Sequence, residues 1–110
     1  MEKSFNLKVG QVVNFYNYSD HAKKYPVEGR VLGIQQANED DREWDLLHWI
    51  WFLNNDGDVC VACHELDGTI GIDYTWKDLA DFDTHPYAAS LNAAGYELSR
   101  EKGYWEVIKK

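Results

Sequence analysis

Residues 46–53 read LLHWIWFL, and this run decides the fold because polar turn residues follow it at once. Apolar side chains occupy both alternating faces of the run, which suits either a strand buried on two sides or the end of a helix begun at Glu39. The next residues, NNDGD at 54–58, favour the strand, since Asp-Gly between two apolar runs is typical of a β-hairpin. The return strand is predicted at 59–66, VCVACHEL.

Further strands are predicted on both sides of this hairpin. A second Asp-Gly turn leads into residues 69–76, where apolar side chains alternate with polar ones as in a half-buried strand. Upstream, residues 7–18 and 27–34 are rich in β-branched and aromatic side chains. Gly29 and Gly33 interrupt the second of these runs, and they mark a bulge or a sharp bend.

Two polar segments lie between the predicted strands and beyond them. Residues 35–45 are predicted to form a loop or a single helical turn capped by Asn38, because acidic side chains favour the first turn of a helix. Residues 77–85 are predicted to form an acidic loop.

The C-terminal part is predicted to fold as a helix followed by a hairpin. A short helix is predicted at 86–94, with Pro86 in its first turn and Gly95 at its end. Two short runs, 96–99 and 104–108, are predicted to pair as a closing β-hairpin.

One domain is expected over 1–110, because a chain of 110 residues has room for a single core. The predicted fold class is α+β, mainly β: a curled antiparallel sheet or small SH3-like barrel of about five strands, one short helix and a C-terminal β-hairpin. The strand order over residues 7–76 is similar to that of SH3-like barrels such as Tudor modules. This architectural resemblance is carried by VGQVV at 9–13 and EGRVL at 28–32.

Charge is unevenly distributed along the chain. The formal net charge is −8, and residues 39–85 contain thirteen acidic side chains against only Arg42 and Lys77. Such a segment repels phosphate, so direct nucleic-acid binding is not expected. It attracts a basic protein surface and speeds the encounter with one. The alternative is that these acidic residues lie in solvated loops and keep the protein soluble.

Aromatic residues are the second unusual feature, at 15% of the chain. A core of this size cannot bury all of them, so some are expected at the surface, where Trp and Tyr anchor partners. The side chains expected to be exposed are Trp44, Tyr74, Trp76, Tyr87 and Trp105. The predicted partner-binding set combines carboxylates with two of these tryptophans: Glu39, Asp40, Asp41, Glu43, Asp45, Asp78, Asp81, Asp83, Trp44 and Trp76.

The segment CVACH at 60–64 matches the C-x-x-C-H pattern of covalent haem attachment. In a strand, however, Cys60 and Cys63 point to opposite faces, which argues against a shared haem, a shared metal ion or a disulfide. Zinc binding by these cysteines with two histidines would need a second C-x-x-C or an H-x-x-x-H pair, and the sequence has neither. Cys60, Cys63 and His64 are therefore expected to be structural, and no cofactor is expected.

An enzyme is the weaker class of function. Asp81, Asp83 and His85 would share one face of an extended segment and could hold a divalent ion or perform acid–base chemistry. His48 lies in the most apolar run and is expected to be a core histidine. The sequence contains no nucleophile elbow, phosphate-binding loop or H-E-x-x-H motif, and no catalytic residues are predicted.

The sequence favours a small, acidic, non-enzymatic binding protein whose partner is a basic protein, with nucleic-acid-binding proteins as one candidate class. A sharper form of this hypothesis is a phage-type inhibitor that mimics nucleic acid by presenting carboxylates in place of phosphates. One alternative is a small-barrel reader module with an aromatic cage for a modified side chain or peptide. Another is a small metal-binding protein or enzyme. A cytoplasmic location is expected because the sequence begins without an apolar signal region and has no apolar run long enough to span a membrane. The sequence does not predict the oligomeric state.

Overall fold

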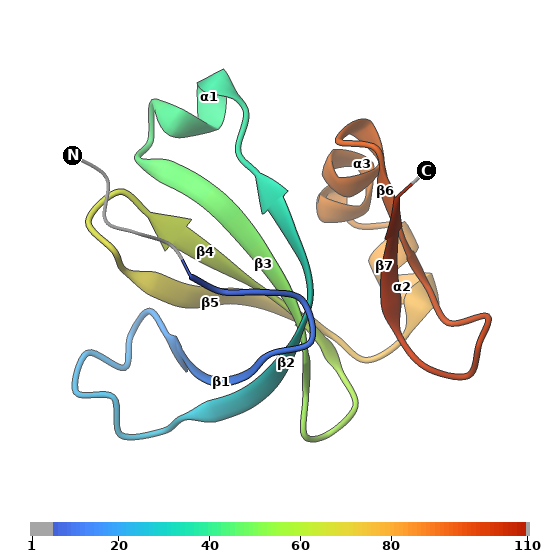
Figure 1. The fold of residues 1–110 in the computed structure, drawn as a ribbon, viewed down its shortest axis with the longest axis horizontal. Helices are drawn as coiled ribbons and strands as arrows, with labels where there is room; N and C mark the ends of the chain where they lie inside the picture. Colours follow the sequence, from blue (N-terminus) through green and yellow to red (C-terminus); the bar gives the residue numbers. More distant parts are fainter. Residues whose placement is uncertain (1–5, 110) are drawn as a thin grey trace.

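The computed structural model describes residues 6–109, and its main body is a five-stranded sheet curled into a closed ring (Figure 1). Each strand pairs antiparallel with the next, and β1 and β5 close the ring in parallel. The closure is parallel because successive strands alternate in direction, so the first and the fifth point the same way. The strands are β1 (Val12–Asn17), β2 (Val27–Gln36), β3 (Leu46–Asn54), β4 (Val59–Glu65) and β5 (Ile70–Trp76).

Three short helices and a two-stranded hairpin complete the fold. They are α1 (Glu39–Arg42), α2 (Leu79–Asp83), α3 (Pro86–Ala93), β6 (Tyr96–Ser99) and β7 (Glu106–Lys109). In Figure 1, α2, α3 and the β6–β7 hairpin lie together on one side of the ring, whereas α1 lies alone at the top. The predicted mainly-β class, ring-like sheet, short helix after residue 85 and closing hairpin are all confirmed.

Helix α2 corrects the sequence-based prediction of a loop at 77–85. The Asp78 side chain caps this helix by accepting a hydrogen bond from the Asp81 backbone N–H at 2.8 Å. Phe82 is buried, and its ring meets those of Trp51 and Trp76 edge-on. One capping residue and one buried ring therefore stabilise a helix too short to show an apolar periodicity in the sequence.

Strands β3 and β4 are buried on both faces because each face packs against a different core. The core inside the ring contains Phe15, Val31, Ile50, Phe52, Cys60 and Ala62. The core on the outer face joins β3, β4 and β5 to the helices and hairpin, and includes Trp49, Trp51, Val61, Cys63, Trp76, Phe82, Leu91, Leu98 and Trp105. This arrangement explains why the run at 46–53 shows no alternation of apolar and polar residues.

The two glycines of β2 serve the curvature of the sheet. The register between β2 and β3 shifts between Val31 and Gly33, which is the irregularity expected there. At Gly29 the Phe52 ring lies so close to the backbone that a Cβ atom would overlap it.

Within the described residues, no helix has both the length and the apolar character needed to cross a bilayer.

Candidate partner-binding surface

Helix α1 forms one corner of the molecule, and its single turn is held by a reciprocal cap. The Asn38 side chain accepts a hydrogen bond from the Asp41 backbone N–H at 2.9 Å, and the Asp41 carboxylate accepts one from the Asn38 N–H at 3.4 Å. Acidic side chains in this first turn also favour the positive end of the helix dipole. Of the predicted partner-binding carboxylates, Asp41 is thus engaged within the helix.

Trp44 follows Glu43, the C-cap residue of α1, and is 84% exposed. Asp45 follows with a φ of 65°, a left-handed conformation that turns the chain into β3. The Leu66 backbone N–H donates a hydrogen bond to the Asp45 carbonyl at 2.8 Å, and Leu66 is itself 45% exposed. This contact brings the β4–β5 turn beside α1. We use the name α1 corner for the surface formed by Glu39, Asp40, Asp41, Glu43, Trp44, Asp45 and Leu66.

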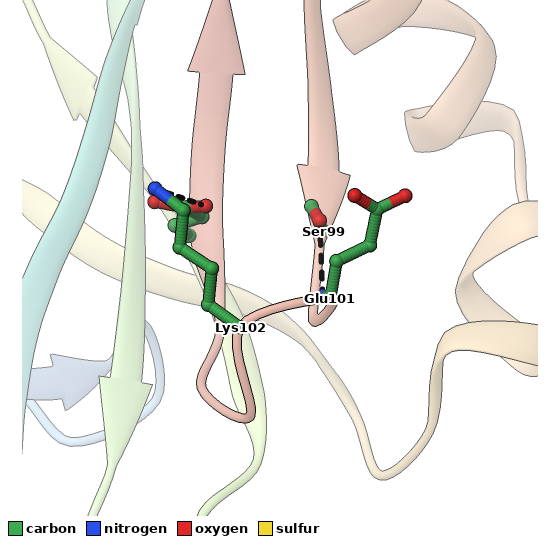
Figure 2. Close-up of polar contacts among 4 residues, drawn as sticks. Ser99, Glu101 and Lys102 are labelled. Atoms are coloured by element: carbon green, nitrogen blue, oxygen red, sulfur yellow. Dashed lines mark hydrogen bonds and ion pairs between the residues drawn. The ribbon is translucent and has the colours of Figure 1, made fainter.

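The α1 corner is negatively charged, because residues 39–45 carry five carboxylates and Arg42 offsets only one of them. Glu39, Asp40, Glu43 and Asp45 are exposed, and no Lys or Arg of the described chain forms an ion pair with them. Lys102 and Glu106 form an ion pair at 3.5 Å in the distant β6–β7 hairpin (Figure 2). The corner therefore projects a negative field around an exposed indole.

The structure does not bring all eight predicted carboxylates together. Leu46 of β3 pairs with Glu65 of β4, which places α1 and the β4–β5 turn at one end of the ring. Val59 pairs with Trp76, which places α2 at the opposite end, beside the β3–β4 turn. The length of β5, about 20 Å of strand, therefore separates the α1 corner from the second acidic group. That group consists of Asp78, Asp81 and Asp83.

The exposure predicted for two tryptophans is wrong. Trp76 is 4% exposed and Trp105 is 6% exposed, because the helices and the hairpin cover the outer face of the sheet. Tyr74 is 45% exposed, as predicted, and Tyr87 is half-buried. Trp44 is thus the exposed member of five tryptophans, and Trp76 contributes to the core instead of to a partner-binding surface.

The rings near α3 form a filled cluster. Ring centroids are 4.8 Å apart for Tyr74 and Trp76, 4.4 Å for Tyr74 and His85, and 5.6 Å for His85 and Tyr87. At these separations the rings pack on one another, as in a core. The Tyr87 hydroxyl donates a hydrogen bond to the Asp73 carboxylate, and burial, followed by this bond, raises the pKa of Tyr87.

Helix α2 also overturns the prediction that Asp81, Asp83 and His85 share one face of an extended segment. Residues two apart do not face the same way on a helix. The His85 ring instead caps α3, where its Nδ1 accepts a hydrogen bond from the Tyr87 backbone N–H at 3.2 Å. Among residues 6–109, no three His, Cys, Asp or Glu side chains are grouped so as to hold a metal ion.

Cys60 and Cys63 lie on opposite faces of β4, as predicted. Cys60 packs inside the ring and Cys63 in the outer core, and both are free thiols. Burial raises the pKa of each thiol, so both stay protonated and are poor nucleophiles at neutral pH.

The Tyr18 hydroxyl donates a hydrogen bond to Glu65 at 3.1 Å and lies beside Cys63; burial raises the pKa of Tyr18.

His48 and His64 form a contact that the sequence-based predictions missed. They are cross-strand partners in β3 and β4, with their Nδ1 atoms 3.0 Å apart. The sequence did contain a signal for this contact. Both histidines lie eight residues from Asp56 at the centre of the predicted hairpin turn, and residues equally distant from such a turn pair across the two strands.

A hollow lies at the seam where β1 meets β5. It measures about 530 Å³, and its lining includes Tyr16, Tyr18, Asp20, His21 and Lys23. The Asp20 carboxylate accepts backbone N–H bonds from residues 24 and 25, so it shapes the β1–β2 loop. Among the polar groups of this hollow, the Asp20 carboxylate therefore serves the loop.

No family model, curated protein or solved structure matches this chain. The functional inference is accordingly built on the α1 corner and on the chemistry of the chain's own residues.

Proposed function

We propose that this protein is a small, non-enzymatic binding protein that engages a basic protein surface through the α1 corner. The observation that carries the proposal is the 84% exposure of Trp44 within a group of exposed carboxylates. A tryptophan in such a position exposes much of its apolar surface to water. Burial of that surface against a partner is favourable in free energy. Tryptophan is also among the residues that contribute most to binding energy at protein interfaces.

The charge of the α1 corner selects the kind of partner. Glu39, Asp40, Glu43 and Asp45 lie within seven residues of chain, so a partner with clustered Lys or Arg gains several charge-assisted contacts at once. A surface of that kind is typical of proteins that bind nucleic acid, because they must neutralise phosphates. We therefore infer that the protein acts as an inhibitor that presents carboxylates where a nucleic acid would present phosphates.

Affinity capture from the native host tests this proposal. The baits are the native protein, Trp44→Ala, and a triple variant carrying Glu39→Lys, Asp40→Lys and Glu43→Lys. The matched controls are Tyr104→Ala, which removes an aromatic ring that is 55% exposed in the hairpin, and Asp81→Lys with Asp83→Lys on α2. A basic partner is expected on the native and control baits and is expected to be lost from both α1-corner variants.

Salt dependence provides a second measurement on the captured partner. Raising the ionic strength is expected to weaken its binding, since screening weakens charge pairs at an exposed surface. A partner that both α1-corner variants retain at native levels would contradict the proposal. The carboxylates of the corner would then serve solubility alone.

A further inference from the structure

A hollow of about 510 Å³ opens at the surface where α2, α3 and β6 meet, in the layer that covers the outer face of the sheet. Helix α3 packs against both α2 and β6 and joins the two sides of the hollow (Figure 1). The volume lies within the range of about 300–1,000 Å³ that is usual for ligand-binding clefts. Because α2 follows Trp76 at the end of β5, the α2 side of the hollow and the α1 corner lie at opposite ends of that strand.

The base of this hollow is apolar, because the outer core reaches the surface there. Phe82, Leu91 and Leu98 line the hollow, and all three belong to that core. Ala88 is buried beside them, and Leu79 is half-buried. An apolar side chain placed in the hollow therefore contacts the core directly and is removed from water, which is favourable in free energy.

The rim of the hollow is acidic. Asp83 of α2, Glu97 of β6 and Glu101 of the hairpin loop are exposed lining residues, and no Lys or Arg of residues 6–109 forms an ion pair with them. Figure 2 shows the Glu101 side chain on the side of β6 that is away from β7. Arg100 also lines the hollow, and its guanidinium lies over the Trp105 ring, 5.2 Å from the ring centroid. The rim thus combines three carboxylates with one cation that stacks on an indole.

We propose that this hollow binds a short segment of a partner protein in which apolar side chains are flanked by Lys or Arg. The apolar side chains extend the outer core into the hollow, and the basic groups pair with the three carboxylates of the rim. An acidic segment is repelled, and a wholly apolar segment buries carboxylates that have no partner. A second copy of this chain is disfavoured as the occupant, since each copy has a formal net charge of −8. The site is separate from the α1 corner and does not rest on the proposed function.

Selection from a phage-displayed library of random dodecapeptides, with the full chain as bait, tests the site. The peptides taken for analysis are those that bind equally well to a variant carrying Glu39→Lys and Asp40→Lys, which excludes ligands of the α1 corner. These peptides are expected to combine apolar residues with Lys or Arg. When such a peptide is added in an NMR titration, the largest amide shifts are expected at residues that line the hollow, such as Leu91, Asn92 and Leu98.

Charge reversal at the rim tests the basic part of the ligand. Glu97→Lys with Glu101→Lys is expected to weaken peptide binding by at least about tenfold, because the rim then repels the peptide's basic groups. Glu39→Lys with Asp40→Lys is the matched control, since it reverses the same number of exposed carboxylates elsewhere. Near-UV circular dichroism establishes that the rim variant retains its packing around Trp105. If it does not, Glu97→Gln with Glu101→Gln takes its place, and a weakening of at least about threefold is expected.

Three outcomes would overturn the site. They are recovery of no peptide that the α1-corner variant also binds, amide shifts that lie away from the hollow, and equal affinity of the native protein and the rim variant for the peptide. None of these outcomes decides the proposed function, because the affinity capture described above depends on Trp44 and the carboxylates of the α1 corner, which the rim variants leave unchanged.

Discussion

Trp44 is an exposed residue whose position is fixed by the backbone around it. Its exposed indole follows a helix of four residues, and the left-handed Asp45 directs the chain away from it into β3. Burial of Trp44 against the rest of this chain is prevented because β3 begins two residues later, at Leu46. The side chain is thus held at the surface by the local backbone.

Fluorescence quenching measures the field around Trp44. At constant ionic strength, with each quenching constant divided by that of free N-acetyltryptophanamide, Cs⁺ is expected to quench the emission more strongly than iodide, because the nearby carboxylates attract the cation and repel the anion. The other four tryptophans are buried, so Trp44→Phe should remove most of the quenchable emission. The triple lysine variant should reverse the preference. Equal normalised quenching by the two ions in the native protein would show that the corner carries no effective negative field.

At the scale of elements, α2 links the end of β5 to the outer core. Phe82 is 3% exposed and packs between Trp51, Trp76 and the α3 layer. The rest of α2 is exposed or half-buried, so this ring supplies most of the apolar burial of the helix.

Phe82→Ala is expected to lower the free energy of unfolding by about 3–5 kcal/mol, as other buried phenylalanines do when truncated. Urea unfolding followed by far-UV circular dichroism measures the change. Asp83→Ala, at an exposed position of the same helix, should change the free energy of unfolding by less than about 0.5 kcal/mol. Similar losses in both variants would mean that α2 depends on its surface as much as on Phe82.

At the scale of the whole molecule, the stability of the fold at alkaline pH depends on four titratable groups. Burial raises the pKa of Cys60, Cys63, Tyr18 and Tyr87 in the folded protein. The folded state therefore holds these protons to a higher pH than the unfolded chain does. Their contribution is present in full below the unfolded values, about 8.5 for Cys and 10 for Tyr, and is lost as the pH rises above them.

The free energy of unfolding, measured in urea, is accordingly expected to be level between pH 7 and 8 and to fall steadily up to pH 10.5. In the variant carrying both Tyr18→Phe and Tyr87→Phe, the fall between pH 9.5 and 10.5 should be shallower, because two of the ionising groups are absent. A native protein whose stability is constant up to pH 10.5 would contradict this expectation.

The sequence by itself determined the local elements. The Asp-Gly turns and the apolar runs located β3, β4 and β5, and Pro86 in the first turn located α3. Asn38 indicated a helical turn as one of two alternatives for residues 35–45, because cap chemistry acts within a few residues. Helix α2 escaped prediction because its stability comes mainly from Phe82, whose burial depends on Trp51 and Trp76 from distant strands.

Only the tertiary structure decided which residues form a site. The layer of helices and hairpin covers Trp76 and Trp105 but leaves Trp44 in solvent. Strand β5 separates two groups of carboxylates that belong to one acidic segment of the sequence. Strand register brought His48 and His64 to 3.0 Å across sixteen residues of chain. Exposure and register depend on which segments pack together, and that information is spread over the whole chain and is absent from any single stretch of it.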